Sequence, residues 1–249
     1  MCATQLEDLF GEISDDESNV TDNEHHVNNS RSKLEVYEHS QIAGLWCCDI
    51  AVPPAQQALL EPQLRRFFVP NLGQNQAMRF GQELLPPSHE CRALLETATA
   101  MLANLSSEVL QHRDPAFDQL IANHYGPSEG IVAHTDLPRF EDGIVIFSFL
   151  STRIMRFVMI SQPHTQIDVV LRPGSCVCLS GDARYKWTHA LEISDDLEEL
   201  IFDKNTNEWT QFPKEERISI TLRKMKPNQI FDMKENVYCE YRFTIPDTL

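Results

Sequence analysis

The sequence predicts a mainly β fold with supporting α-helices: a double-stranded β-helix, or jelly roll, flanked by N-terminal helices. Two observations predict it. Beyond Pro115 the chain shows short apolar runs with a period of two residues, separated by turn pairs such as Gly126-Pro127 and Gly181-Asp182. Ahead of Pro115 the apolar residues recur at helical spacing instead. About eight antiparallel strands preceded by helices form a jelly roll with helical support on one face.

Two helices are expected ahead of the strands. The first follows Pro53-Pro54, because proline suits the first turn of a helix. The second begins at Ser88, a residue type that caps helix N-termini, and ends near Gln111. Residues 75–81 between them are expected to be irregular. The apolar residues that these helices direct toward a core are Leu59, Leu60, Leu64 and Phe67 in the first and Leu94, Leu95, Ala98, Met101, Leu102 and Leu105 in the second.

Nine later segments show the alternation or the short apolar runs of β-strands. A longer segment among them, residues 194–216, is rich in acidic and polar residues and is expected to be a surface insertion. The expected strands are Gln119–Tyr125, Ile131–His134, Gly143–Leu150, Arg153–Ile160, Gln166–Arg172, Ser175–Leu179, Trp187–Ile193, Arg217–Lys224 and Val237–Thr244.

The chain of 249 residues is expected to form one domain over residues 34–249, preceded by a disordered acidic tail over residues 1–33. The tail has few large apolar side chains, although those at helical spacing between Leu6 and Ile13 leave open a short amphipathic binding segment. The formal net charge of the whole chain is -16. Because sequence-independent binding of duplex nucleic acid depends on lysine and arginine, this charge leaves room for a local basic patch at most.

Neither a membrane helix nor a disulfide framework is indicated. The longest apolar run, Ile144 to Leu150, is about a third of the roughly 20 residues that a membrane helix needs, and the acidic N-terminus does not resemble a signal peptide. The seven cysteines are odd in number and show no C-x-x-C spacing, which favours reduced, packed thiols. We therefore expect a monomer in the nucleus and/or cytoplasm with no membrane partner.

One short stretch holds a candidate metal site. His134 and Asp136 are two residues apart, so on an extended strand both side chains leave the same face and reach one ion. His189, further along the chain, is the candidate for a third ligand. Two histidines and one carboxylate form the facial triad of non-haem iron(II) oxygenases, which leaves positions open for a cosubstrate and oxygen.

A late strand carries a row of polar residues. Within residues 217–223, simple alternation puts two arginines, a serine and a threonine on one face. An inward-facing arginine is costly unless an anion accompanies it, and a dicarboxylate cosubstrate would supply that anion. One arginine would hold the distal carboxylate through two hydrogen bonds while the keto-acid end chelates iron. Asn123 and Tyr125 lie two residues apart on the strand that leads to His134.

Four motifs occur in a fixed order: Asn-x-Tyr-x-Pro from Asn123, His-x-Asp from His134, Gly-Asp-Ala-Arg-Tyr-x-Trp-Thr-His from Gly181 and Arg-x-Ser-x-Thr-x-Arg from Arg217. In this combination the sequence resembles the AlkB-like family of 2-oxoglutarate/Fe(II)-dependent dioxygenases, over roughly residues 75–225. The resemblance implies an enzyme that uses Fe(II), 2-oxoglutarate as cosubstrate and O2, with a lid over the substrate that includes residues 75–81.

The resemblance also implies a role for each matched residue. Two positions depart from the family pattern: Ser128 and Leu150 stand where glycines are usual, which concerns the shape of the substrate pocket rather than the iron chemistry. The implied roles are iron ligands for His134, Asp136 and His189, a salt bridge to the distal carboxylate of 2-oxoglutarate for Arg217, hydrogen bonds to the cosubstrate for Asn123, Tyr125 and Ser219, and a place near the keto-acid end and Asp136 for Arg223.

Three hypotheses remain open for the substrate. The first is oxidative demethylation of an alkylated base in DNA or RNA, with Arg79, Phe80 and Arg139 as local contacts. The second is hydroxylation or demethylation of a basic protein such as a histone, which the acidic surface would attract. The third, an inactive binding module, is disfavoured because every expected ligand is present.

Overall fold

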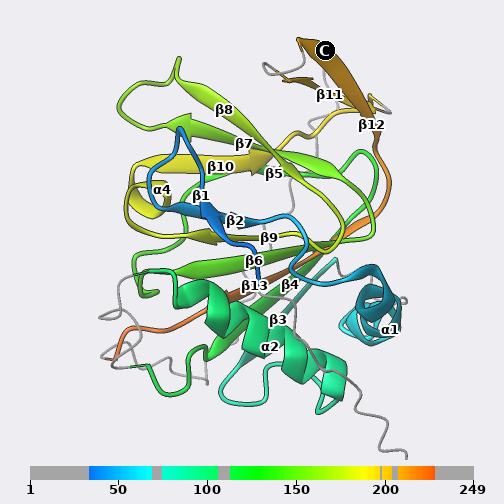
Figure 1. Ribbon diagram of the computed structural model, residues 1–249, viewed down its shortest axis with the longest axis vertical. Helices are drawn as coiled ribbons and strands as arrows, with labels where there is room; N and C mark the ends of the chain where they lie inside the picture. Colours follow the sequence, from blue (N-terminus) through cyan, green and yellow to red (C-terminus); the bar gives the residue numbers. More distant parts are fainter. Residues whose placement is uncertain (1–33, 69–74, 106–112, 197, 204–206, 228–249) are drawn as a thin grey trace, which may run out of the picture. The chain divides into compact units, whose positions relative to one another are not determined.

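The structure is a computed structural model that describes residues 34–68, 75–105, 113–196, 198–203 and 207–227 (Figure 1). Strands outnumber helices in this part of the chain. In chain order its elements are β1 (Tyr37–Glu38), β2 (Leu45–Cys48), α1 (Pro54–Arg65), β3 (Gln76–Phe80), α2 (His89–Leu102), β4 (Gln119–Tyr125), β5 (Ile131–His134), β6 (Ile144–Phe149), β7 (Arg153–Met159), β8 (Gln166–Leu171), β9 (Cys176–Leu179), α4 (Gly181–Tyr185), β10 (Trp187–Leu191), β11 (Glu198–Asp203), β12 (Glu208–Pro213) and β13 (Arg217–Arg223).

Two antiparallel sheets form the body of the domain. The larger has seven strands in the order β1-β2-β9-β6-β13-β4-β3, and the smaller has four in the order β5-β10-β7-β8. In Figure 1 the smaller sheet lies over one face of the larger, while α1 and α2 lie on its other side. The strands β11 and β12 pair separately as a hairpin. The predicted jelly roll with helical support is confirmed.

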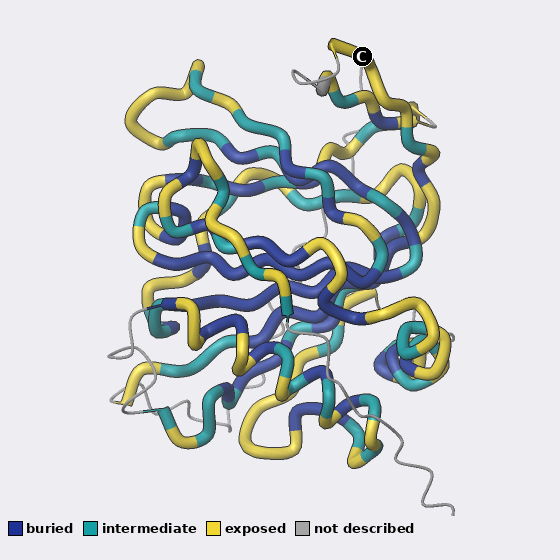
Figure 2. The backbone as a smooth tube through the Cα atoms, in the orientation of Figure 1, coloured by how far each residue is buried: buried dark blue, intermediate teal, exposed yellow. Residues whose placement is uncertain are grey.

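The central strands β9, β6 and β13 of the seven-stranded sheet are buried on both faces, and alternation along them separates two cores. On β6, Phe147 belongs to the core shared with α1 and α2, whereas its neighbour Ile146 belongs to the core between the two sheets. Figure 2 shows this sheet as the most continuously buried part of the domain. Any polar side chain on the inner face therefore enters a nearly water-free space, where it needs a specific partner.

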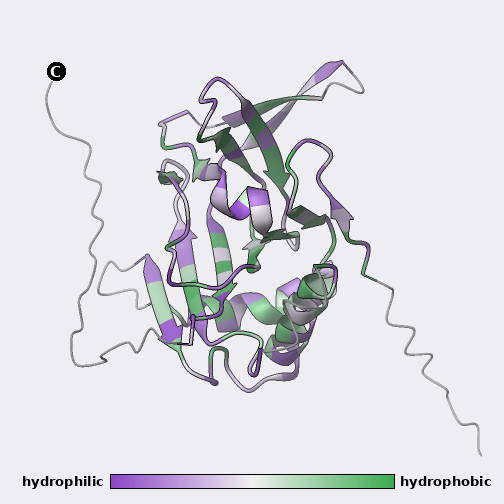
Figure 3. Cartoon of the chain, turned by 90° about the vertical axis from the view of Figure 1, so that its left-hand side faces the viewer, coloured by the Kyte–Doolittle hydropathy of each residue, from purple (hydrophilic) through white to green (hydrophobic). Residues whose placement is uncertain are grey.

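The helices follow the predicted pattern with two exceptions, and Figure 3 shows both hydrophobic and hydrophilic residues along them. Ser88 caps α2, since its Oγ accepts a hydrogen bond from the backbone N–H of Cys91 at 3.1 Å. Leu59 was expected in the core but is 59% exposed, because it lies on the solvent side of α1. The helix α2 ends at Leu102 rather than near Gln111, and Asn104 caps its last turn through Nδ2, which donates to the carbonyl of Ala100 at 3.0 Å.

Two segments that were expected to be irregular or surface-exposed contain strands. Residues 76–80 form β3, an edge strand that pairs with β4. The insertion over residues 194–216 contains the β11–β12 hairpin. The expected turn at Gly181-Asp182 instead begins the short helix α4. Propensity within residues 76–80 did not predict β3, because its hydrogen-bond partner β4 lies elsewhere in the chain.

The predictions on cysteines, membrane helices and the chain ends can be compared with the described part of the structure. Five cysteines in the described part are free and buried, as expected for reduced, packed thiols. None of the helices in the described ranges is long and apolar enough to cross a membrane. The predicted tail over residues 1–33, the end of the second predicted helix over residues 106–112 and the predicted strand Val237–Thr244 lie outside the described residues.

Leu150 stands where the resembled family usually has a glycine, and its backbone explains the family preference. The residue follows β6 with φ 76°, a left-handed conformation that glycine adopts without a steric cost. A leucine in this conformation costs roughly 1–2 kcal/mol. Packing of the partly buried Leu150 side chain against the helix-side core offsets part of that cost.

Candidate active site

The three candidate iron ligands lie together at the end of β5. Antiparallel pairing of β5 with β10 places His134 directly opposite His189, and their ring centroids are 4.4 Å apart. Asp136 follows β5 by two residues, and its Oδ2 lies 3.9 Å from Nε2 of His189. The fold therefore brings together three side chains that the sequence placed on two separate strands.

The donor chemistry of this group fits iron(II). His134 Nδ1 lies 2.9 Å from the carbonyl oxygen of Val132, a contact that leaves Nε2 of the neutral ring free to bind a metal. Burial lowers the pKa of His189 to about 4, so this imidazole is neutral at pH 7. The side chains do not form a closed cage: among the described residues no three metal-binding side chains adopt a ready-made coordination geometry.

Asp136 is held ionised by arginine. Burial alone would raise the pKa of this carboxyl, but Arg223, His189 and Arg184 together lower it below its usual value. Arg223 Nη2 lies 2.7 Å from Asp136 Oδ1, so the expected place of Arg223 beside Asp136 is observed. Because Arg223 contacts Oδ1, the second carboxylate oxygen, Oδ2, lies on the side of His189.

Arg184 is part of the site although no role was predicted for it. It lies on α4 with 2% exposure, and Nη1 and Nη2 donate to the backbone carbonyls of Asp136 and Leu137, both at 2.9 Å. These bonds fix the chain that carries Asp136. Arg184 belongs to the motif that begins at Gly181, but its role could not be predicted because the two segments are joined only by contacts across the fold.

Arg217, at the opposite end of β13 from Arg223, is a buried positive charge. Arg217 lies opposite Tyr125, and its Nε donates to Ser148 Oγ at 2.9 Å. Burial lowers the pKa of Arg217 to about 10, which still leaves it charged at pH 7. Its Nη2 is buried without a hydrogen-bond partner among the described residues. A carboxylate placed there would satisfy both the charge and the donor.

The remaining predicted cosubstrate contacts lie in the same row across the larger sheet. Ser219 lies opposite Asn123 on β4 and Ser148 on β6. Asn123 Oδ1 accepts a hydrogen bond from Gln76 Nε2 at 2.7 Å. Gln76 and Ser148 were not predicted as site residues, because both enter through strand register rather than through a motif.

The three predicted substrate contacts are divided between two faces. Phe80, like Arg223, lies opposite Gln119, so both side chains leave the inner face of the sheet. Arg139 lies near them, since Arg139 and Arg223 both contact the ring of Phe140. Arg79 is one residue out of phase and stacks on Phe67 at 4.5 Å, on the helix side. The structure therefore does not bring Arg79 into the candidate site.

A family comparison decides the class of this site. The model of the 2OG-Fe(II) oxygenase superfamily matches residues 56–223, which contain every candidate ligand. The chain belongs to the 2OG-Fe(II) oxygenase superfamily. This oxygenase is thus an oxidoreductase, and Fe(II), 2-oxoglutarate and O2 are the cofactors and cosubstrates of the family.

Curated relatives confirm the AlkB-like resemblance. The oxygenase is 30% identical over 143 residues to tRNA (carboxymethyluridine(34)-5-O)-methyltransferase ALKBH8 of Mus musculus, covering 53% of this chain and 21% of the relative. It is 33% identical over 100 residues to alpha-ketoglutarate-dependent dioxygenase alkB homolog 7, mitochondrial, of Bos taurus, covering 40% of this chain and 42% of the relative. The chain thus spans less than half of either relative.

Solved structures to which the chain is similar include OsALKBH1, with a TM-score of 0.49 and 13% identity over 76% of this chain and 100% of that one. A prolyl-4-hydroxylase of Pseudomonas putida also has a TM-score of 0.49, with 11% identity over 74% of this chain and 93% of that one.

Proposed function

We propose that the oxygenase oxidatively demethylates alkylated bases in DNA or RNA, by hydroxylation of an N-methyl carbon. The observation that carries the proposal is the row of side chains that β13 directs toward the interior between the sheets. At one end of this row Arg223 contacts Asp136, and at the other end Nη2 of Arg217 has no hydrogen-bond acceptor among the described residues. A keto acid that chelates a metal beside Asp136 and carries a second carboxylate for Arg217 would match the charges at both ends.

In this proposal His134, Asp136 and His189 hold Fe(II), and Arg217 binds the distal carboxylate of 2-oxoglutarate. With Fe(II) and 2-oxoglutarate held by these residues, the site would convert 2-oxoglutarate, O2 and an N-methyl group to succinate, carbon dioxide and an N-hydroxymethyl group, and loss of formaldehyde would leave the nitrogen demethylated. Arg223 orients Asp136, and the neutral ring of His189 supplies a lone pair without first losing a proton.

A base substrate is favoured by the inner side of the edge strand β3. Met78 and Phe80 alternate with the helix-facing Arg79, and they are 47% and 37% exposed. A flipped base stacks on side chains of this kind, and Arg139 adds positive charge near Arg223. The printed name of one relative, a tRNA methyltransferase, also supports a nucleic-acid substrate.

A basic protein such as a histone is the second candidate substrate, favoured by the net charge of -16.

An assay of formaldehyde and succinate release separates the two candidates. The oxygenase is incubated with Fe(II), 2-oxoglutarate and one substrate at a time: methylated DNA or RNA oligonucleotides, tRNA or histones. Substrate-dependent formaldehyde from oligonucleotides or tRNA supports the first. Release from histones alone would overturn it. His134→Ala is the inactive control, and His164→Ala, at an exposed histidine, is the matched active one.

A further inference from the structure

A second buried arginine, Arg153, lies near Arg217 in the space between the two sheets. Arg153 begins β7 and has 0% exposure. Met155 and Phe157 alternate with it along the strand, and both belong to the core between the sheets. Arg153 therefore extends from the inner face of the smaller sheet, toward the same interior that holds Arg217 on the larger sheet.

The bonds of Arg153 leave one donor free. Its Nε donates to Glu199 Oε1 at 2.9 Å, and its Nη2 donates to the backbone carbonyls of Glu129 at 3.1 Å and Glu192 at 3.3 Å. Nη1 is buried with no hydrogen-bond partner in the described ranges. Because an unsatisfied charged donor is expensive to bury, the site is suited to an acceptor that the described residues do not supply.

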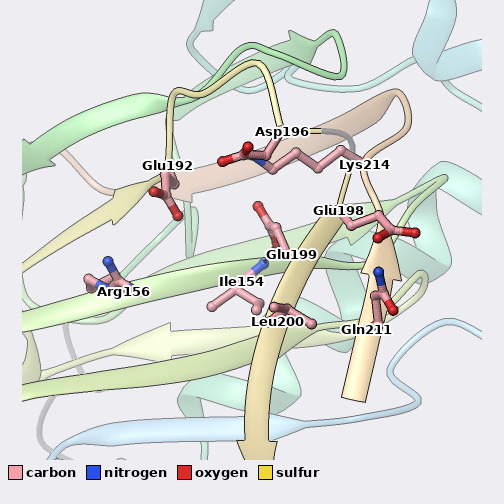
Figure 4. Close-up of a pocket in the computed structure, with 9 residues that line it drawn as sticks. All are labelled: Ile154, Arg156, Glu192, Asp196, Glu198, Glu199, Leu200, Gln211 and Lys214. Atoms are coloured by element: carbon pink, nitrogen blue, oxygen red, sulfur yellow. Dashed lines mark hydrogen bonds between the residues drawn. The ribbon is translucent and has the colours of Figure 1, made fainter. Parts of the chain in front are cut away.

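Glu199 reaches this place from the β11–β12 hairpin. Its side chain is almost fully buried, and its second oxygen accepts a hydrogen bond from the backbone N–H of Ile154. Figure 4 shows Glu199 beside Ile154, and both line a cavity of about 520 Å³ together with other residues of β7 and the hairpin. The insertion, expected to be a surface feature, thus contributes one carboxylate to the protein interior.

Three chain segments meet at this end of the fold. Glu129, whose carbonyl binds Arg153, follows the end of β4 closely. Ser151, two residues before Arg153, donates through Oγ to the carbonyl of Glu215, two residues before Arg217. The charge of Arg153 adds to burial in lowering the pKa of Arg217, as expected for two nearby cations.

The charges at this end do not balance. Arg153 and Arg217 are both cationic, whereas Glu199 supplies one negative charge. Burial raises the pKa of Tyr125, so the phenol stays neutral. One positive charge and two unpartnered guanidinium donors remain in a low-dielectric interior, and a single carboxylate would neutralise the charge and accept from both donors.

We infer that Arg153 is a second binding residue for the distal carboxylate of the cosubstrate, and that Glu199 limits the positive charge there so that the pocket accepts one carboxylate. The inference rests on the proposed role of Arg217. It assigns the β11–β12 hairpin to the cosubstrate pocket, through Glu199, rather than to the surface alone.

The test is calorimetric titration of the full chain, loaded with Mn²⁺ as an inert stand-in for Fe(II), with 2-oxoglutarate. Arg153→Gln leaves Glu199 facing the carboxylate and should weaken binding about tenfold or more. Glu199→Gln removes the opposing charge and should tighten binding several-fold. Should Arg153→Gln fail to fold, the double variant Arg153→Gln/Glu199→Gln, which leaves no unpaired carboxylate at this place, should bind between wild type and Arg153→Gln. Glu198→Gln, an exposed neighbour on β11, should match wild type.

If the Arg153–Glu199 ion pair only stabilised the fold, the variants would show a different pattern of affinities. Damage to the fold would weaken binding in Arg153→Gln and Glu199→Gln alike, and that result, or affinities equal to wild type, would overturn the inference. The ligand 2-oxopentanoate, which has a methyl group in place of the distal carboxylate, should bind all variants equally, and parallel losses for both ligands would also overturn it. If Mn²⁺-loaded wild type does not bind 2-oxoglutarate, the proposed function fails as well.

Discussion

At the scale of single residues, the candidate site is defined by buried charged side chains. Some are paired with an opposite charge, and others have a guanidinium N–H with no acceptor among the described residues. Asp136 is ionised because Arg223 is 2.7 Å away, and Arg217 is charged although it is almost fully buried. Burial of a charge costs free energy unless a partner compensates it. The residues that lack such a partner in the described part of the chain are therefore the ones expected to respond most strongly to ligands.

Arg217→Lys should weaken 2-oxoglutarate binding by about ten- to a hundredfold. Lysine keeps the charge but loses the planar pair of donors, and a charged hydrogen bond contributes roughly 1.5–3 kcal/mol. Calorimetric titration with Mn²⁺ in place of Fe(II) measures the change, and Mn²⁺ affinity should stay the same. Arg172→Lys, at an exposed arginine, is the control. Equal affinities would show that the distal carboxylate is held elsewhere.

The metal-free protein should lose stability as the pH falls from about 6.5 to about 4. Burial lowers the folded-state pKa of His189 to about 4, so in this range the unfolded chain binds more protons than the folded one. Stability is therefore fully present above pH 6.5, and the loss reaches about 3 kcal/mol near pH 4. Urea unfolding at several pH values measures it. His189→Gln should flatten that part of the curve, and an unchanged slope would contradict the assignment.

At the scale of elements, capping and register decide where each helix and strand begins. The cap of α2 is local, because Ser88 and Cys91 are three residues apart. The place of β3 is not local, because it depends on pairing with β4 from Gln76↔Asn123 to Phe80↔Gln119. Local caps follow from the sequence, whereas edge strands depend on the neighbour that they join.

Ser88→Ala should lower the free energy of unfolding by about 1 kcal/mol, because the N-terminal N–H groups of α2 lose their side-chain acceptor. Chemical denaturation with urea measures the change. Ser161→Ala, at an exposed turn serine, is the matched control and should leave the midpoint unchanged. A Ser88→Ala variant as stable as wild type would show that water replaces the cap at no cost.

At the scale of the whole molecule, the two sheets and the charge have separate consequences. The sheets bring residues from β4, β5, β10 and β13 to one interior, and this arrangement supports the chemistry. The net charge of -16 acts at longer range, on the approach of a partner or substrate. Near the candidate iron site, Arg139 and Arg223 form a local exception to the acidic composition.

Deletion of residues 1–33 should leave the melting temperature and the substrate-free turnover of 2-oxoglutarate almost unchanged. A segment of this composition has too few large apolar side chains to offset the entropy of ordering. Differential scanning calorimetry and succinate release compare the truncated and full chains. A drop of many degrees would show that the segment packs on the domain.

The bounds of two strands, and the side chains that share one face of a third, could be predicted from the sequence alone. The bounds of β4 and β5 agree with the prediction, and alternation along β13 placed Arg217 and Arg223 on one face. The spacing of His134 and Asp136 indicated a shared ligand set in the same way. These features were accessible because side-chain direction within one element depends only on its local backbone period.

Only the tertiary structure decided which residues complete the site. Arg184 binds the carbonyl of Asp136 48 positions earlier, and Arg153 binds Glu199 46 positions later. The same holds for Arg79, which strand register turns toward the helices. No local pattern encodes such pairings, because they form only when separate elements pack and remove charged groups from water.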